Sequence, residues 1–283
     1  VIGLQCKALI IADEGYEGAY TSGVLGLGMD MAFRAGVALR DMEFMTRHPL
    51  TIKGTNMFLP TGLLLDGASL HEASGAPIEV DGQSSLEISA SVLAAVQPVL
   101  DARSMGQSAS WWGSLFRLVK QRTGIDMNRQ TIEVAPIPTH TIGGLPTDEH
   151  GRVVLQSWAR WFTGLYAAGS ASSSGLHGAD VLEGNRLLEA IAVGEAAGTH
   201  AAEWIQKRKF TAATLLEDAQ GLAEAELSML GGETEGPVQR LNPVFTRLKE
   251  ILTSLQTPAS VASDYDAAAE MLEQLSIKAE QLY

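Results

Sequence analysis

The stretch from Gly164 to Gly198 holds the residues of this chain best suited to binding an anion. Its pattern predicts a buried strand over 165–168, a loop bounded by glycines, and a helix over 185–207 rich in small residues. Such a junction brings backbone N–H groups and a helix N-terminus up to a ligand, and both favour negative charge. We therefore expect a ligand-binding turn between this strand and this helix.

Charge and cysteine content exclude other kinds of site. The net charge of −13 argues against a nucleic-acid groove, where basic residues are expected. The single cysteine, Cys6, rules out an internal disulfide and a cysteine-ligated cluster within the chain, and we expect no metal site. Cys6 precedes an apolar run, which predicts packing in the core and fits a reducing compartment, cytoplasmic or matrix-like.

The apolar pattern predicts a mixed α/β fold followed by an all-helical tail. No apolar run reaches the length of about 18 residues that a membrane span needs, so membrane contact is expected only through partners. A strand is predicted over 7–12 and a turn at 147–152. Helices are predicted over 24–39, 84–103, 111–123, 185–207, 211–230, 241–255 and 264–282. The tail helices are amphipathic, and they either pack on their own chain or offer a face to a partner subunit.

Four segments, in order along the chain, resemble one family of flavoproteins. That family comprises the flavoprotein subunits of succinate dehydrogenase and fumarate reductase, and L-aspartate oxidase. The matching segments are KALIIADEGYEGAY, LGLGMDMAFRAGVALRDMEFMTRHP, PIPTHTIGGLPTDEHGRV and GLYAAGSASSSGLHGADVLEGNRLLE. They cover roughly residues 5–60 and 130–205, so the middle and the end of the chain match poorly.

The resemblance implies an FAD-binding α/β domain interrupted by a capping domain and followed by helices. Its expected parts are the FAD domain over 1–47 and 137–206, the capping domain over 48–136 and a helical domain over 207–283. The family's strand–GxGxxG–helix unit, which cradles the FAD pyrophosphate, has no counterpart here. Three explanations stay open: the sequence is a fragment, a separate chain carries the N-terminal half of the FAD domain, or the fold is truncated.

The family moves a hydride between a dicarboxylate and flavin, which implies three candidate catalytic residues here. His48, in RHP, aligns with the first family histidine, and a loop or capping role is the alternative. The second family histidine aligns with Thr139, so a one-residue slip is needed to bring His140 to the site, and regular strand alternation would turn it to the opposite face. Arg103 is the nearest match to the proton-shuttling arginine; an exposed arginine at a helix end is the alternative.

For FAD, the resemblance implies contacts mediated largely by the backbone. The expected cofactor-binding residues are Gly15, Gly169, Ser170, Asn185, Arg186 and Leu187. Several family side chains are replaced: Leu27 and Ser170 stand for acidic residues, Arg186 for a serine, and Val181 for the arginine that binds a substrate carboxylate. Arg186 either adds positive charge beside the flavin or points to water. His177 is expected to hold its loop by hydrogen bonds or to belong to the site.

Three functions follow from this resemblance. The first is an FAD-dependent oxidoreductase subunit acting on a dicarboxylate-like substrate and passing electrons to an iron–sulfur subunit, on the cytoplasmic or matrix side and peripheral to a membrane complex. The second is a flavoenzyme of the same fold with a less anionic substrate, favoured by Val181 and by FLPTGLLL in place of the family's threonine–glutamate segment. The third is a non-catalytic scaffold with a degenerate site.

Overall fold

The computed structural model describes residues 6–17, 26–155, 160–209, 219–221, 223–225, 242–254 and 262–280. The chain forms two compact units. The first comprises residues 1–42, 143–176 and 184–283, and the second comprises residues 43–142 and 177–183. The second unit is therefore an insertion into the first, as a capping domain would be. The boundaries predicted at 47/48 and 136/137 fall inside two strands of the inserted unit, Met45–Ile52 and Ile132–Thr141.

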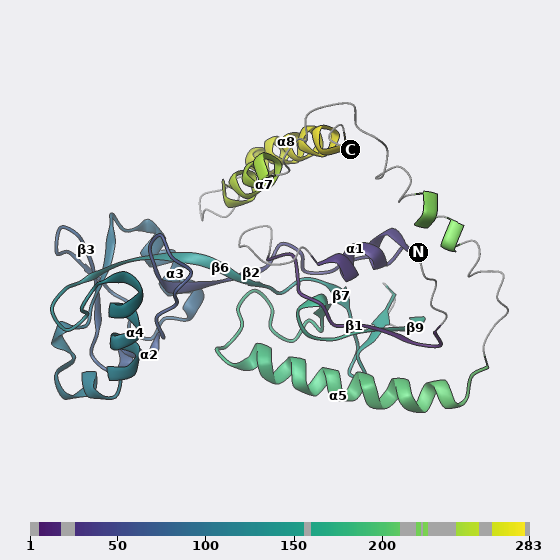
Figure 1. Cartoon of the computed structure of the whole chain (residues 1–283), viewed down its shortest axis with the longest axis horizontal. Coiled ribbons are helices and arrows are strands. Elements are labelled where there is room, and N and C mark those ends of the chain that lie inside the picture. The colour runs from purple at the N-terminus through teal and green to yellow at the C-terminus, as the bar shows by residue number, and fades with distance from the viewer. Residues whose placement is uncertain are drawn as a thin grey trace. The chain divides into compact units, whose positions relative to one another are not determined.

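The first unit is built on a short mixed sheet of order β1-β9-β8 (Figure 1). Its strands are β1 (Leu9–Ile11), β8 (Arg152–Val154) and β9 (Trp161–Ala167). β1 runs parallel to β9, and β8 runs antiparallel to it. A second parallel pair joins β7 (Leu145–Pro146) and β10 (Ser172–Ser173). Parallel strands place their carboxyl ends at one edge of a sheet, which is where ligands bind in open α/β folds.

Two helices of the first unit begin at glycines in the left-handed conformation. α1 (Leu27–Arg34) follows Gly26, and α5 (Asn185–Gln206) follows Gly184. α1 lies close to β1, because a Cβ on Gly28 would come within 2.5 Å of the Ile11 side chain. Only glycine allows this approach, and the core beneath consists of small and branched residues such as Ala32, Val153 and Ala167.

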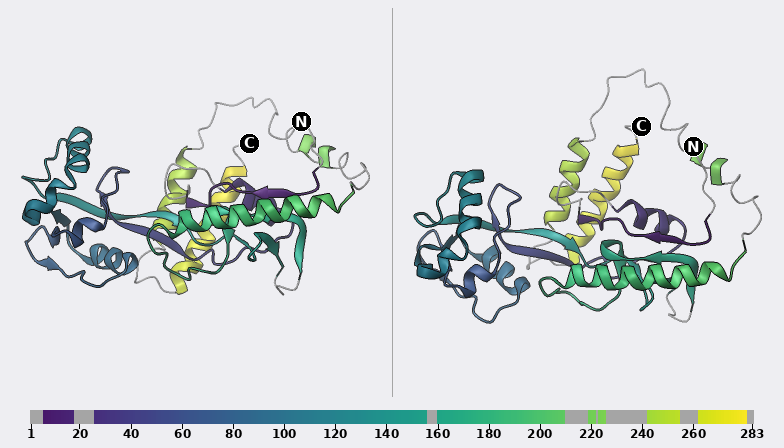
Figure 2. Two further views of the ribbon diagram at one scale, coloured as in Figure 1. Left: turned by 90° about the horizontal axis from the view of Figure 1, so that it is seen from below. Right: turned by 60° about the horizontal axis from the view of Figure 1, so that its bottom comes forward.

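The second unit contains a five-stranded antiparallel sheet of order β2-β6-β5-β3-β4. Its strands are β2 (Met45–Ile52), β3 (Ser69–Glu72), β4 (Pro77–Ile78), β5 (Pro98–Asp101) and β6 (Ile132–Thr141). Its helices are α2 (Gly62–Leu65), α3 (Ser85–Ala94), the 3₁₀ helix η2 (Arg103–Ser110) and α4 (Gly113–Thr123). β2 and β6 form the long ribbon of two strands in Figure 2.

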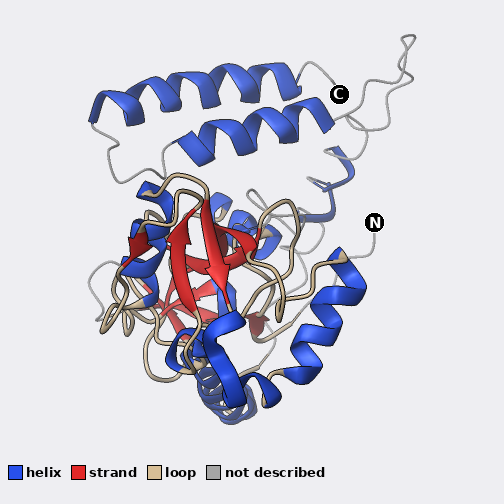
Figure 3. Ribbon diagram, turned by 90° about the vertical axis from the view of Figure 1, so that its left-hand side faces the viewer, coloured by secondary structure: helices blue, strands red, loops and turns tan. Residues whose placement is uncertain are grey.

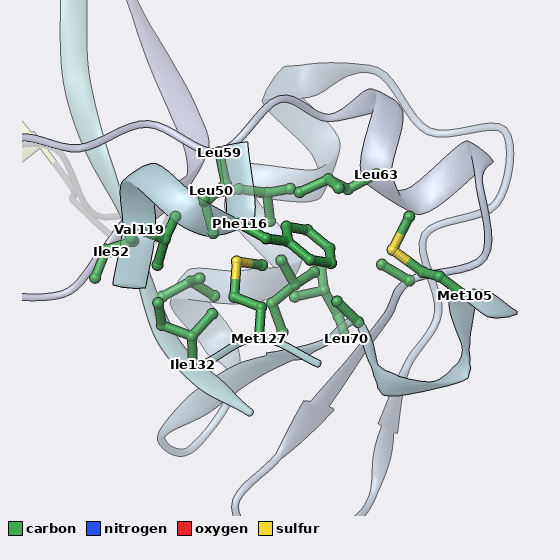
Figure 4. Close-up of a cluster of buried hydrophobic side chains, with 14 of the residues drawn as sticks. Leu50, Ile52, Leu59, Leu63, Leu70, Met105, Phe116, Val119, Met127 and Ile132 are labelled. Atoms are coloured by element: carbon green, nitrogen blue, oxygen red, sulfur yellow. The ribbon is translucent and has the colours of Figure 1, made fainter. Parts of the chain in front are cut away.

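A single apolar core holds the second unit together. Side chains from its sheet and helices point toward one another in Figure 4, and Leu50, Leu63, Leu100 and Val119 are fully buried. Burying each such leucine contributes roughly 1.5–3 kcal/mol. The unit thus has its own core, and β2 and α3 both contribute side chains to it.

Three expectations about local structure are wrong. The helix predicted over 84–103 ends at Ala94, because Gln97 takes a positive φ of 49° and Pro98 starts strand β5. Cys6 is exposed rather than packed in the core. In the strand predicted as buried over 7–12, only Ile11 is buried, whereas Leu9 and Ile10 are 49% and 41% exposed.

In the tail, α7 (Asn242–Ser254) and α8 (Ala262–Glu280) match the helices predicted over 241–255 and 264–282 to within two residues at each end. The two helices pack side by side (Figure 3). Arg247 of α7 donates to Met271 Sδ of α8 at 3.6 Å. Most of the helix predicted over 211–230 lies outside the described residues.

Candidate functional site

The predicted ligand-binding turn begins where β9 ends. Ala168 N–H donates to the carbonyl of Ile11 at 3.0 Å, which ties the end of β9 to the end of β1. Gly169 then takes a positive φ of 67° and opens the 3₁₀ helix η3 (Gly169–Ala171). Ser172 Oγ donates to the Gly169 carbonyl at 2.8 Å and fixes the turn. Backbone rather than side chains therefore shapes this edge of the sheet, as the glycine pattern predicts.

The start of α5 is open to a ligand. Gly184, the N-cap, has φ 85° and provides no side-chain cap for the first turn. A Cβ there would meet nothing within 4 Å. Leu187 and Leu188, in that first turn, are 69% and 63% exposed. A helix N-terminus beside an apolar surface suits a flat, electron-rich ring better than a small hydrated anion.

Arg186 points inward rather than to water. Only 16% of its side chain is exposed, and its guanidinium donates to Ser170 Oγ at 3.3 Å and lies 3.9 Å from Glu189. Burial lowers the pKa of Arg186, while Glu189 and Glu17 raise it. An arginine keeps its proton under such conditions. Positive charge is therefore fixed at the start of α5, balanced by two carboxylates that are each only 8% exposed.

The turn after β1 carries Asp13, whose carboxylate caps a helix. Asp13 Oδ2 accepts from the Gly28 N–H at 2.6 Å and so caps the start of α1. Asp13 Oδ1 is buried without a hydrogen-bond partner among the described residues. Gly15 is buried, and its carbonyl lies 3.1 Å from the place a Cβ on Gly26 would take. The Asp13 carboxylate already occupies the N-terminus of α1. The N-terminus of α5 has no side-chain cap and is therefore the one left for a ligand.

These features fit the flavin end of FAD. Arg186, Ser170 and the first turn of α5 supply positive charge and hydrogen-bond donors, which suit the electron-rich pyrimidine edge of a flavin. Leu187 supplies apolar surface for the ring. The sequence has no GxGxxG, so nothing in it fits the pyrophosphate in the same way.

His48 lies in β2, and two contacts orient its ring. Its Nδ1 accepts from the Leu50 N–H at 3.3 Å, and its ring lies 5.0 Å from that of Phe58. The neutral ring therefore carries its proton on Nε2. Burial lowers the pKa of His48, an effect that the Glu183 carboxylate partly offsets. His48 is thus a neutral hydrogen-bond donor at neutral pH.

A shift of register in the β2–β6 ribbon changes the expectation for His140. His140 pairs with Thr46, and Ile137 pairs with His48, so β6 has one extra residue between these pairs. Directly opposed residues of an antiparallel pair share a face. Since Thr46 and His48 are two residues apart, the pairing gives His140 the same face of the ribbon as His48. The regular alternation that would turn it away does not hold here.

Thr139, which aligns with the second family histidine, lies beside the same strand. Its Oγ1 is 3.2 Å from Thr46 Oγ1 and 3.3 Å from the Thr46 carbonyl. Thr46 Oγ1 also donates to the carbonyl of His140 at 3.1 Å. The register shift is therefore held by threonine hydroxyls.

Arg103 forms an ion pair with its neighbour in sequence. Its guanidinium donates to both oxygens of Asp101, at 2.9 Å and 2.6 Å. Half of the Arg103 side chain is exposed. The hydrogen bonds from Arg103 lower the pKa of Asp101, and Asp101 raises that of Arg103. Arg103 starts η2, and Ser104 next to it bonds to the Gly67 carbonyl at 3.0 Å.

The loop over 177–183 brings a carboxylate that the sequence did not point to. Val181, at the position of the family's carboxylate-binding arginine, is 8% exposed. Glu183 Oε1 accepts from Thr61 Oγ1 at 2.7 Å and from Ser85 Oγ at 3.4 Å. The family's threonine–glutamate segment has no counterpart in FLPTGLLL. Thr61, within FLPTGLLL, nevertheless donates a hydrogen bond to a glutamate 122 positions away. Only the fold could reveal this pair. His177, at the start of the loop, is half-buried.

The described part of the chain has neither a metal-binding cluster nor a membrane-spanning helix. No three histidine, cysteine or acidic side chains among these residues are close enough to hold a metal ion. None of the helices described is both long and apolar enough to cross a membrane.

Comparison with known proteins relates the chain to flavoproteins. A fumarate reductase flavoprotein subunit from Serratia sp. (strain ATCC 39006) is 28% identical over 72% of this chain. An L-aspartate oxidase from Pyrococcus abyssi is 33% identical over 68% of it, and a mitochondrial succinate dehydrogenase flavoprotein subunit from Xenopus laevis is 28% identical over 96%. The chain spans 39%, 42% and 44% of these relatives.

Solved structures agree on the fold. The E. coli quinol fumarate reductase chain FrdA superposes with a TM-score of 0.83 at 23% identity, covering 96% of this chain and 52% of that one. A Mycobacterium smegmatis Sdh1 structure gives 0.72 at 22%, covering 96% and 48%. Residues 7–187 match the FAD binding domain family. Since that match includes β1, the inserted unit and the start of α5, the chain belongs to the FAD-binding domain family.

Proposed function

We propose that the chain forms part of an FAD-dependent oxidoreductase that moves a hydride between a carbon atom of an organic acid and the flavin. Membership of the FAD-binding domain family supports the cofactor. The observation that carries the proposal is the start of α5, where an open helix N-terminus, exposed Leu187 and buried Arg186 meet. When bound, FAD supplies the two-electron acceptor or donor.

In this proposal the first unit binds and tunes the flavin. The first turn of α5 and Ser170 orient the ring by hydrogen bonds. Arg186 adds a positive charge that Glu189 holds in place, at 3.9 Å. A guanidinium next to the ring favours the reduced, more negative flavin and so assists hydride transfer to it, and the Glu189 and Glu17 carboxylates reduce this effect.

The second unit handles the acid. His48, neutral and protonated on Nε2, donates a hydrogen bond to a carboxylate oxygen of the substrate. His140, on the same face of the ribbon by its pairing, is a second candidate donor. Arg103 is the candidate proton carrier, a role in which it must leave its pair with Asp101. A partner with iron–sulfur clusters would accept the electrons, and the protein would lie peripherally on the cytoplasmic or matrix side of a membrane complex.

The buried Val181 favours a less anionic substrate over a dicarboxylate. A dicarboxylate needs a fixed cation for each carboxylate, and valine offers none. The second class also agrees with the apolar segment FLPTGLLL, of which Leu59 and Leu63 are fully buried. We therefore place a small organic acid with one carboxylate ahead of succinate or fumarate.

An absorption spectrum of the purified protein with its co-purifying chains tests the proposal. We expect flavin bands in stoichiometric amount that bleach when a saturated acid substrate is added without oxygen. Iron analysis of the same sample tests the iron–sulfur partner. A protein that stays colourless with added FAD and its partner chains would contradict the proposal and favour the non-catalytic scaffold.

A further inference from the structure

The Glu183 carboxylate is held by two hydroxyl groups from different elements of the second unit. Thr61 immediately precedes α2, and Ser85 is the first residue of α3. Both donate to the same oxygen, Oε1, at 2.7 Å and 3.4 Å. Two donors converging on one carboxylate oxygen are an arrangement that also suits a ligand's carboxylate.

Neither hydroxyl is needed for the helix beside it. Thr61 is the N-cap of α2 but makes no side-chain cap bond there. In α3 the cap is Ser84, which accepts from the Glu87 N–H while Glu87 bonds back to Ser84. The side chain of Ser85 is therefore spare at this helix N-terminus. Both donors are free to serve whichever carboxylate reaches them.

His48 belongs to the same region. The Glu183 charge raises the pKa of the His48 ring against the larger, lowering effect of burial. α3 packs on β2, the strand that carries His48. The Ser89 hydroxyl of α3 donates to the Ser85 carbonyl at 2.7 Å and lies 3.4 Å from the Arg47 carbonyl of β2. The Glu183 carboxylate is thus bound by the first residue of α3, the helix that packs on the strand carrying His48.

We infer that Glu183 determines specificity, because its carboxylate occupies the Thr61 and Ser85 hydroxyls and keeps a second substrate carboxylate away from them. This inference rests on the proposed function, since it concerns the acid that the same site binds. Val181 acts in the same direction two residues earlier, because it is buried and uncharged. The substrate therefore bears a neutral or cationic group at this end.

Repulsion between like charges sets the size of the effect. Two carboxylates a few ångströms apart at a protein surface repel each other, and water and salt weaken that repulsion. We expect a discrimination of roughly tenfold between a dicarboxylate and its monoester. The variant Glu183→Gln removes the charge and keeps the shape.

The test is a titration of the flavin-loaded protein, with its co-purifying chains, with fumarate and with monomethyl fumarate. Dissociation constants come from the perturbed flavin spectrum. The wild type should prefer the monoester by about tenfold, and Glu183→Gln should remove most of that preference. Asp180→Asn, which removes the same charge three residues away in the same loop, is the matched control and should keep the preference.

Four outcomes would overturn the inference: an unchanged preference in Glu183→Gln, an equal change in Asp180→Asn, a wild type that prefers fumarate, or no binding of either acid by wild type and variant. A protein without flavin would instead contradict the proposed function. In that case the two acids are titrated by calorimetry into the flavin-free protein, with the same expectations for Glu183.

A second readout does not depend on flavin. Proton NMR of the His48 ring measures its pKa in the flavin-free chain. Glu183→Gln should lower that pKa, and Asp180→Asn should leave it closer to wild type. An unchanged His48 pKa would show that the carboxylate does not face the histidine.

Discussion

Arg186 and Glu183 are three residues apart in the sequence, yet their surroundings differ in kind. The Arg186 side chain is only 16% exposed and interacts with the buried Glu189 and Glu17, and its neighbours are held by backbone turns at Gly169 and Gly184. Glu183 is exposed and is held by hydroxyls from α2 and α3. A buried charge must be balanced by its neighbours, whereas an exposed one can be exchanged at little loss of stability. The residues proposed to bind the flavin are therefore the more constrained of the two sets.

The largest expected effect is on stability, and it tests whether Arg186 is constrained in this way. Arg186→Ala leaves Glu189 and Glu17 buried without their cation, and it should lower the free energy of unfolding by about 3 kcal/mol. Denaturant unfolding measures this. The control is Arg34→Ala, whose ion pair with Asp30 is 70% and 49% exposed and should contribute less than about 1 kcal/mol. Equal effects of the two variants would mean that the Arg186 cluster is not a buried one.

Substitutions at two glycines test how tightly the backbone is packed in the first unit. In Gly28→Ala the new Cβ would lie 2.5 Å from Ile11 and 2.9 Å from Asp13, so overpacking should destabilise the protein by about 2 kcal/mol. In Gly194→Ala, within α5, the new Cβ meets nothing within 4 Å, and helix propensity should add up to about 1 kcal/mol. Opposite shifts of the thermal midpoint are expected, and shifts of the same sign would contradict the close approach of α1 to β1.

His48 gives the second unit a pH dependence of predictable sign. Because burial lowers its pKa below the ordinary value of 6.5, the unfolded chain binds the proton more readily than the folded one. The contribution of His48 to stability is complete above pH 6.5 and declines as the pH falls toward its lowered pKa. His48→Gln should flatten this part of the stability profile. The pKa of His200 is lowered too, mainly by burial, so part of the slope should remain.

Arg103 should show the smallest structural effect. Its pair with Asp101 is exposed, so Arg103→Ala should leave the denaturation midpoint almost unchanged. A large loss of turnover in this variant, at unchanged flavin content, would support the proton-carrying role. Full turnover in this variant would mean that Arg103 serves only in its ion pair with Asp101.

Glycines and apolar runs made the proposed flavin-binding part predictable from sequence. The strand ending at Ala167, the turn at Gly169 and the helix starting at Asn185 lie where the pattern predicts them. Each depends on local chemistry: backbone freedom at glycine, or periodic apolar residues. The prediction of a helix over 84–103 is wrong in its second half. The apolar residues around Leu100 form strand β5 there and pair with β3.

The part proposed to bind the acid depends on contacts that no local pattern encodes. The extra residue in β6 that brings His140 to the face of His48 arises from pairing with β2. The Thr61–Glu183 bond joins residues 122 positions apart. The sequence could suggest His48 and the loss of an arginine at Val181, but not the carboxylate that the fold brings there.

The short distance along the chain between these two groups has a practical consequence for redesign. Val181, Glu183 and Arg186 fall within six consecutive codons, and Gly184, with a φ of 85°, lies between the two charged residues. One small randomised cassette can therefore vary the charge preference for the acid and the charge beside the cofactor at the same time. A library screened by colour and by turnover would separate retention of the cofactor from choice of substrate in a single experiment.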